Sequence, residues 1–243
     1  MNYNWDWGVI FQLSPTGEGS YLDLLINGTM WTLVTSVSSW ILALSVGIVI
    51  GIMRAYPSKV ARAFSRGYVE LFRNIPLLVQ LFLWYFVVPE FLPNDFGRVI
   101  KQSQDAPFYT AVIGIGFYMS ARIAELVKGG IQALPTGQYQ AGLALGLKPF
   151  ECFRYVLIPM ALRIILPPMT NDMMNTVKCT SVALTIGLME LTAQSRATAE
   201  FSFQIFEAFS IAIAVYVIIN YIIVFVMSRL ERKLYIPGSM GAK

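Results

Sequence analysis

The strongest constraint in this sequence is a set of long apolar segments. A helix that crosses a lipid bilayer needs about 20 apolar residues. We predict five spans, at residues 24–53, 70–92, 108–131, 161–180 and 207–227. Hydrophobic residues make up 56% of the chain and charged residues only 13%, which is typical of integral membrane proteins and not of soluble domains. The sequence therefore predicts an all-α, multi-pass protein embedded in the bilayer.

Basic residues are absent from the first 53 positions and then arrive in clusters. Loops on the cytoplasmic side of a membrane carry an excess of Lys and Arg. This rule predicts an N-terminus outside the cytoplasm and a C-terminus inside it. The basic residues flank apolar spans, so we discount nucleic-acid binding. The two clusters are Arg54, Lys59, Arg62, Arg66 and Arg73, and Arg229, Arg232 and Lys233.

The predicted spans divide the chain into a periplasmic segment at residues 1–23, a membrane domain at residues 24–229 and a cytoplasmic tail at residues 230–243. Residues 54–66 are expected to form a short amphipathic helix along the membrane surface. Residues 180–206 mix apolar and polar side chains, and we interpret them as a broken or re-entrant span followed by a periplasmic loop. Aromatic residues near the N-terminus are candidate anchors at the membrane–water interface: Trp5, Trp7 and Tyr21.

Residue types that carry chemistry are scarce. The chain has no histidine, which removes the usual metal ligand and neutral-pH base. Its two cysteines, Cys152 and Cys179, lie in a predicted cytoplasmic loop and inside a span, which disfavours a disulfide or a metal site. A G-x-x-x-x-G-K-[ST] phosphate-binding loop is missing. The sequence therefore predicts no catalytic residue, no metal site and no cofactor on this chain.

Ionisable groups inside the third predicted span need a partner or a water-filled cavity, because each costs about 2.5 to 3.5 kcal/mol at the centre of a membrane. Arg122 is followed by Glu125 and Lys128 on the same predicted helix. One interpretation is an Arg122–Glu125 pair on one helix face. The other is that Arg122 faces a transport pathway and binds a substrate carboxylate through its planar fork of donors.

A polar stripe follows in the fourth predicted span. Asn171, Asn175 and Lys178 have the spacing i, i+4, i+7, which predicts that they share one face of a continuous helix. The stripe indicates either a cavity or an inter-subunit seam on one interpretation, and ordinary helix-to-helix hydrogen bonding on the other.

The loop at residues 135–159 is the long segment best suited to face water and a partner. Its first half carries small side chains at Ala141, Gly142, Ala144 and Gly146, which let another surface approach the backbone closely. Lys148-Pro149 is expected to break this helix, and Pro149 can occupy the first position of a second short helix.

The spacing within this loop resembles the coupling loop of membrane subunits of binding-protein-dependent, ATP-driven importers. The family pattern is Glu-Ala-Ala, three residues, Gly, nine residues and Ile-x-Leu-Pro. Here Gln140-Ala141-Gly142 precedes Gly146, and Val156-Leu157-Ile158-Pro159 closes the pattern. The resemblance implies that Gln140, Ala141, Gly142, Gly146 and Pro159 belong to the segment that docks on the ATPase subunit. Gln140 replaces a glutamate, so a charged contact there is not implied.

Further motifs resemble the polar amino-acid uptake permeases, a branch of these importers, and within it those for glutamate and aspartate. The resemblance implies a type I importer fold in a bacterial inner membrane. It also implies a cytoplasmic ATP-binding dimer that carries ATP and Mg²⁺, a second permease subunit and a periplasmic amino-acid-binding protein. The motifs include Asn4 to Gly8, Tyr68 to Gln80, Ala124-Glu125, Gly129 to Gln132, Val177 to Ser181 and Leu230 to Gly238.

Two other functions remain open from the sequence. An ion-driven secondary transporter would need coupling carboxylates near the middle of the membrane, and Asp172 is the one plain candidate. A membrane scaffold without transport activity would tolerate replacement of Arg122 and Lys178 by leucine.

Overall fold

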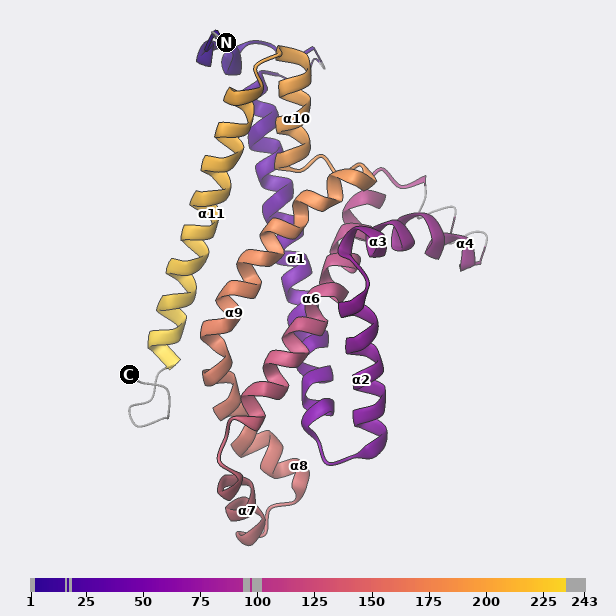
Figure 1. Ribbon diagram of the computed structural model, residues 1–243, viewed down its shortest axis with the longest axis vertical. Coiled ribbons are helices and arrows are strands. Elements are labelled where there is room, and N and C mark those ends of the chain that lie inside the picture. The colour runs from indigo at the N-terminus through magenta and orange to yellow at the C-terminus, as the bar shows by residue number, and fades with distance from the viewer. Residues whose placement is uncertain (1–2, 16, 18, 94–96, 98–101, 235–243) are drawn as a thin grey trace. The chain divides into compact units, whose positions relative to one another are not determined.

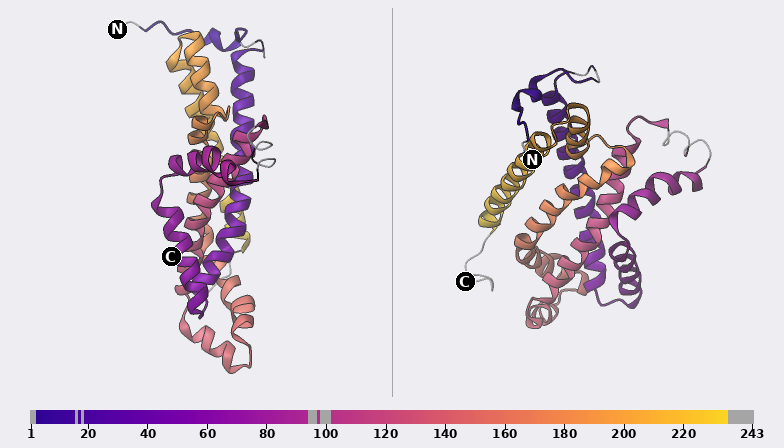
Figure 2. Two further views of the ribbon diagram at one scale, coloured as in Figure 1. Left: turned by 90° about the vertical axis from the view of Figure 1, so that its right-hand side faces the viewer. Right: turned by 45° about the horizontal axis from the view of Figure 1, so that its top comes forward.

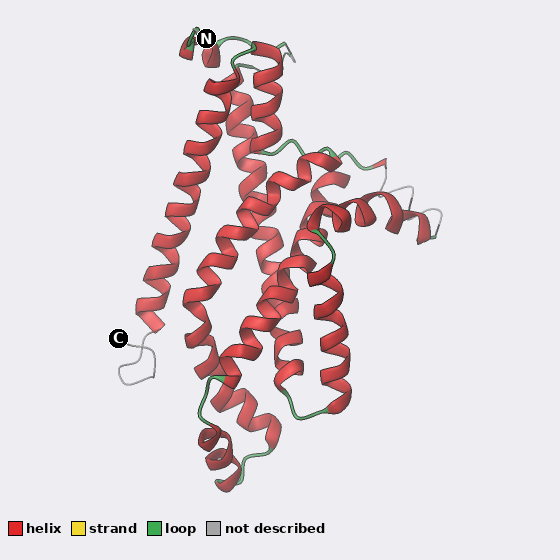
Figure 3. Cartoon of the chain, viewed as in Figure 1, coloured by secondary structure: helices red, strands yellow, loops and turns green. Residues whose placement is uncertain are grey.

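The computed structural model describes residues 3–15, 17, 19–93, 97 and 102–234, and this part of the chain is almost entirely helical (Figures 1 and 3). It contains no strand, only an isolated bridge between Leu13 and Ser20. Among the described residues, four helical stretches are long and apolar enough to cross a membrane, and a bent helix pair gives a fifth candidate. The all-α membrane fold predicted from the sequence is therefore confirmed. The four are α1 (Tyr21–Ala55), α6 (Ala106–Gln132), Pro149–Ile186 and α11 (Ile205–Leu234).

The other elements are shorter, and two of them, η2 and η3, are π-helical turns. In chain order they are η1 (Trp7–Phe11), α2 (Lys59–Asn74), α3 (Leu77–Phe82), η2 (Leu83–Val87), α4 (Val88–Phe91), α7 (Thr136–Ala144), α8 (Pro149–Cys152), η3 (Phe153–Leu157), α9 (Ile158–Thr180), η4 (Ser181–Ile186) and α10 (Leu191–Ser202).

The chain forms two compact units, each assembled from three separate segments. Unit 1 combines residues 1–41, 76–116 and 175–221. Unit 2 combines residues 42–75, 117–174 and 222–243. Both units are built from helices that the sequence predicts as spans, so each has to satisfy its buried polar groups internally.

Short polar side chains fix where helices begin. At the start of α1, the Asp23 carboxylate accepts hydrogen bonds from the backbone N–H and hydroxyl of Ser20, at 2.8 and 2.7 Å. At the start of α2, the Ser58 hydroxyl accepts from the N–H of Ala61 at 3.4 Å. Each satisfies a donor that the first helical turn leaves unpaired.

The bent pair differs from the prediction in where its helix begins. Helix α2 already starts at Lys59, so the expected surface helix and the start of the expected second span are one continuous helix. It ends at Asn74 because Ile75, which precedes Pro76, is extended, as a residue before proline prefers. A separate helical stretch, at residues 77–91, begins after Pro76.

Two glycines bring α1 and α6 close together inside unit 2. A Cβ on Gly47 would lie 2.7 Å from the Cβ of Ile123, and one on Gly51 would lie 2.6 Å from the Cβ of Val127. Glycines four residues apart let two helix backbones approach in a membrane, where close packing drives association. Helix α2 joins this contact through Val69, which is buried against Ile50.

The segment at residues 180–206 is helical with two breaks, at residues 187–190 and 203–204. The 3₁₀-helix η4 ends at Gly187, whose φ of 90° is accessible to glycine at little cost. Helix α10 then begins after Glu190, whose side chain accepts hydrogen bonds from the N–H groups of Thr192 and Ala193. Within unit 1, α10 lies beside α11 (Figure 2). The two helices pack through Leu191 and Ala212.

Candidate functional site

The loop between α6 and α9 is a compact helical hairpin within unit 2, built from α7, α8 and η3. Its first helix ends in a Schellman motif. The N–H of Gly146 bonds to the carbonyl of Leu143 at 3.0 Å, and the N–H of Leu147 bonds to the carbonyl of Gly142 at 3.1 Å. Gly146 has a φ of 86°, so the glycine of the sequence motif occupies the left-handed position that closes this helix.

The small residues of α7 have different surroundings. Gly142 is buried, and a Cβ there would lie 2.7 Å from the sulfur of Cys152 in α8. Gln140 and Ala141 are exposed, as is Gly146. The close approach expected at Gly142 is therefore made by α8 of the same chain, whereas Gln140 and Ala141 are available to another surface.

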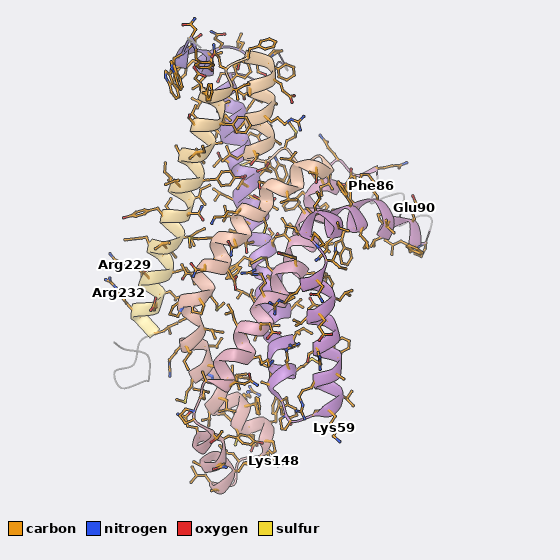
Figure 4. All side chains as sticks on the ribbon, in the orientation of Figure 1. Lys59, Phe86, Glu90, Lys148, Arg229 and Arg232 are labelled. Atoms are coloured by element: carbon orange, nitrogen blue, oxygen red, sulfur yellow. The ribbon has the colours of Figure 1, made fainter. Side chains whose placement is uncertain are left out.

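The second helix of the hairpin starts as the sequence predicts. Pro149 occupies the first turn of α8, and the N–H of Lys148 bonds to the Glu151 carboxylate at 2.8 Å. Lys148 itself lies at the turn between α7 and α8 (Figure 4). Large apolar side chains are exposed beside this turn, with Leu145 at 84% and Phe150 at 63%. Exposed apolar side chains gathered on a water-facing loop are typical of a docking surface.

Pro159 has a local structural role. The preceding turn, η3, is π-helical, and the N–H of Ile158 bonds to the carbonyl of Phe153, five residues back. A proline inside a regular α-helix lacks a donor and clashes with the carbonyl four residues earlier. The wider turn accommodates this ring. Pro159 is half-buried and follows the turn by two residues.

The charged residues of α6 are paired differently from the same-helix pair considered above. The Nε of Arg122 lies 3.0 Å from an oxygen of Asp172 in α9. The Arg122 side chain is 44% exposed, but that of Asp172 only 7%. The Arg122–Glu125 pair is therefore wrong, because a carboxylate distant in the sequence lies closer in space. The Arg122 side chain therefore remains partly accessible to solvent beside the buried carboxylate of Asp172.

Glu125 is instead the centre of a three-cation cluster from three helices. Its carboxylate lies 2.6 Å from Arg54, 3.6 Å from Arg73 and 3.8 Å from Lys128. Arg54 is 14% exposed, and its Nε and Nη1 are buried without a hydrogen-bond partner in the part of the chain that the structure describes. The cluster links α1, α2 and α6 at one level of unit 2.

The polar stripe of the fourth span lies on a single helix, since α9 runs from Ile158 to Thr180. Asn171, in unit 2, is exposed. In unit 1, Asn175 is half-buried and Lys178 is exposed. The helical spacing required by the prediction is met, and their place on a pathway stays a prediction.

Two buried carboxylates of unit 1 were missed from the sequence. Glu190 is fully buried and accepts hydrogen bonds from the hydroxyl of Tyr216 at 3.0 Å and from two backbone N–H groups of α10. Glu207 is also fully buried and accepts from the N–H of Asp6 at 2.8 Å and from the hydroxyl of Tyr3. A glutamate just before a helix was the available signal for Glu190.

No cluster of three or more possible metal ligands occurs in the described ranges, and neither Cys152 nor Cys179 forms a disulfide there. The arrangement as a whole offers a hairpin with exposed apolar side chains and, separately, paired charges. It suits binding and conformational coupling.

Comparison with known proteins identifies the family. The sequence model described as "Binding-protein-dependent transport system inner membrane component" matches residues 47–235. The chain belongs to this family. It is therefore a multi-pass inner-membrane component of a transport system, and the resemblance seen in the sequence motifs is confirmed.

Two curated relatives of this permease family cover nearly the whole chain. The glutamate/aspartate import permease protein GltJ of Escherichia coli (strain K12) is 42% identical over 246 residues, covering 100% of both chains. The glutamine transport system permease protein GlnP of the same strain is 34% identical over 231 residues, covering 95% of this chain and 98% of GlnP. The ATPase of such importers is a separate subunit, as the sequence predicts.

Solved structures share the permease fold. A chain from the crystal structure of an amino acid ABC transporter with histidines superposes with a TM-score of 0.74, at 29% identity, covering 88% of this chain and 95% of that one. A chain of the MetNI methionine ABC transporter in an inward-facing conformation gives 0.69 at 22% identity, covering 92% and 100%, and supports the fold alone.

Proposed function

We propose that this chain is the permease subunit of an ATP-driven importer for amino acids with an acidic side chain, glutamate and aspartate. The similarity to GltJ over the full length supports the substrate class. The observation that carries the mechanism is the α7–α8 hairpin, which exposes Leu145 and Phe150 beside a turn closed by Gly146. An ATPase that grips this hairpin can transmit its closure to α6 and α9, which flank it in the chain.

The proposed assembly contains partners on both sides of the membrane. A cytoplasmic dimer of ATP-binding subunits, which holds the ATP and Mg²⁺, engages residues 135–159. A second permease subunit completes the path, and a periplasmic amino-acid-binding protein delivers the substrate. The basic residues at Arg54 and Arg229 support an N-terminus outside and a C-terminus in the cytoplasm.

The docking role is tested at Leu145, because its exposed side chain can be changed without disturbing the hairpin. In a complex reconstituted with its ATPase, Leu145→Glu is expected to reduce ATPase co-purification and ATP-driven uptake about 10-fold, the equivalent of one lost apolar contact. The matched control is Phe201→Glu in α10, an exposed apolar residue outside the hairpin. Unchanged association in the Leu145 variant would contradict the docking assignment.

A glycine pair separates hairpin shape from surface contact. In Gly146→Ala, the new Cβ meets no atom within 4 Å, but the residue keeps a positive φ, which strains an alanine. This variant is expected to lower ATP-driven uptake by the equivalent of about 1 kcal/mol. Gly137→Ala, in α7 with equally open space, is expected to be neutral or slightly stabilising. Equal ATP-driven uptake by the two variants would show that the Schellman turn is dispensable.

Substrate recognition is assigned to Arg122, with Glu125, Asn171, Asn175 and Lys178 along the same proposed pathway. A guanidinium that is half exposed beside Asp172 can bind a second carboxylate, that of the substrate. Arg122→Ala is expected to lower uptake of glutamate at least ~10-fold, the loss of about 1.4 kcal/mol. Arg122→Lys keeps the charge but not the fork and should be intermediate. Wild-type uptake of a basic amino acid at the same rate would defeat the acidic assignment.

The two rival functions are distinguished by reconstitution. Uptake driven by an ion gradient, in vesicles that contain this chain and no ATPase, would favour a secondary transporter. Full uptake by Arg122→Leu and Lys178→Leu in the complete complex would favour a scaffold.

A further inference from the structure

The N-terminal segment of unit 1 folds back onto the first turn of α11. The Glu207 carboxylate accepts hydrogen bonds from the Tyr3 hydroxyl and from the N–H of Asp6, 2.8 Å away. The side-chain carbonyl oxygen of Gln204 also lies 2.6 Å from the Tyr3 hydroxyl. The segment that precedes α1 is therefore pinned to the beginning of a different span.

This attachment gathers aromatic rings at one place. We call Tyr3, Trp5, Trp7 and Phe206 the aromatic ledge. Tyr3 meets Trp5 and Phe206 edge to face, with ring centroids 5.0 and 4.7 Å apart. Trp5 stacks on Trp7 at 5.8 Å. Both tryptophans and Phe206 remain about half exposed, so the rings pack on one another and still present a surface.

The helix η1, which begins with Trp7 of the ledge, has one buried side and one exposed side. Val9 and Ile10 are buried against Tyr21 and Leu24 at the start of α1. Phe11, at the end of η1, and Leu13 just after it are strongly exposed. This short segment therefore uses one side to pack on a span and leaves large apolar groups on the other.

The ledge continues a lipid-facing stripe. Phe206, Ile213 and Val217 have the spacing i, i+7, i+11, which places them on one face of α11, and all three are exposed. Only 11% of the residues in the most apolar part of α11 are buried in the structure. A helix that is apolar all round and poorly covered by protein faces lipid.

The two carboxylates at the ledge, those of Glu207 and Asp6, both accept hydrogen bonds from the N-terminal segment. Glu207 is fully buried under its two donors, and the Asp6 carboxylate accepts from the N–H of Gly8 at 2.9 Å. Three of the four rings of the ledge, those of Tyr3, Trp5 and Trp7, combine an apolar body with an O–H or N–H. Such rings concentrate where a bilayer meets water.

We propose that the aromatic ledge is a membrane-binding surface that lies in the headgroup region of the bilayer, with phospholipid as its occupant. It fixes the depth at which α11 enters the membrane, and Glu207 is the positioning residue that holds it there. A docking surface for a soluble protein is the competing occupant. The continuity with the exposed stripe of α11 favours lipid.

The test uses the tryptophan emission of the full chain in lipid nanodiscs that carry bromine at different depths. The contribution of Trp5 and Trp7 is obtained by subtracting the emission of the variant Trp5→Phe/Trp7→Phe, in which the ring contacts are kept. We expect bromines near the headgroups to quench this contribution at least ~2-fold more strongly than bromines near the bilayer centre. Should the double variant not fold, the subtraction is made with Trp7→Phe alone.

Two results would overturn the proposal. One is quenching by aqueous acrylamide with no quenching by any brominated lipid. The other is shielding of Trp5 and Trp7 only after a periplasmic binding protein is added.

A second variant tests the positioning role. Glu207→Ala should shift the emission of the ledge to longer wavelength and reduce its quenching by shallow bromines at least ~2-fold, because the attachment to α11 is lost. The matched control is Glu200→Ala, an exposed glutamate paired with Arg196 in α10, which should leave both readouts unchanged. Unchanged quenching in the Glu207 variant would refute the role of this residue.

Discussion

The two units pair their buried and half-buried carboxylates in different ways. In unit 1, Glu190 and Glu207 bind hydroxyl and backbone N–H groups. In unit 2, Glu125 and Asp172 bind arginine and lysine side chains. Neutral donors from the backbone are fixed in position, because they cannot leave without unfolding a helix end. Long cationic side chains can change partners by rotation alone.

This difference suggests separate roles: the carboxylates of unit 1 hold segments together, and the ion pairs of unit 2 are free to exchange during transport. The unit 1 carboxylates tie together segments far apart in the chain and are expected to be static. In unit 2, an anionic substrate can compete with Asp172 for the half-exposed Arg122. The acids of unit 1 should therefore matter for stability, and the pairs of unit 2 for function.

The largest effect on stability is expected at Glu190. Replacement by alanine removes the cap of α10 and leaves the hydroxyls of Thr32 and Tyr216 without this acceptor, for a loss of about 2 kcal/mol in the free energy of unfolding. Glu190→Gln keeps one acceptor oxygen and should lose less. Thermal unfolding of the purified chain in detergent measures both. An equal loss in the two variants would mean that packing, not hydrogen bonding, dominates at this position.

The next largest effect is expected at the pair of Arg122 and Asp172. Arg122→Ala removes the cation from a buried acid and should cost about 1.5 kcal/mol, less than for a fully buried pair because the guanidinium is half exposed. Adding Asp172→Asn should recover most of that loss. A double-mutant cycle of unfolding free energies checks the coupling. Strictly additive losses would show that the two side chains do not stabilise each other.

A smaller contrast is expected inside the Glu125 cluster. Arg54→Ala should cost about 1 kcal/mol, because this side chain is close to the carboxylate and mostly buried, whereas Arg73→Ala should cost no more than about 0.5 kcal/mol. Both losses are measured by the thermal unfolding assay used for the Glu190 variants. A larger loss in the Arg73 variant would reverse the order that distance and burial indicate.

The smallest effect is expected for Arg196→Ala in α10. Its partner Glu200 is four residues away at 2.7 Å, and both side chains are mostly exposed. Pairs of this kind contribute about 0.3 kcal/mol, so the unfolding temperature should hardly change. A loss as large as that of Glu190→Ala would remove the distinction between buried and exposed carboxylates in unit 1.

Much of the fold follows from the sequence, because apolar length and helix-breaking residues act locally. The all-α membrane architecture and the two helices of the hairpin follow from hydropathy, from the small residues near Gly146 and from Pro149. Motif spacing indicates the family, because each motif is a short local segment of the sequence. The spacing also singled out Gly146, and the structure adds the physical cause, a left-handed turn.

The partners of charged side chains did not follow from the sequence. A carboxylate three residues from Arg122 is an obvious local candidate, yet Asp172 is fifty residues away and only tertiary folding brings it near. The bonds that tie Tyr3 to Glu207 cross even more of the chain. Nothing local distinguishes such long-range pairs from ordinary polar residues near a helix end.

The π-helical turns at η2 and η3 each end two residues before a proline, Pro89 in one case and Pro159 in the other. Each turn holds one surplus residue compared with a regular α-helix, which rotates every later side chain by about 100° around the axis. Helical-wheel diagrams drawn straight through either turn will therefore assign the wrong face downstream. Cysteine-scanning of α8 and α9 should be indexed separately on the two sides of Phe153–Leu157, and deleting one residue there should rotate the pattern of labelled positions in α9 by about 100° relative to α8.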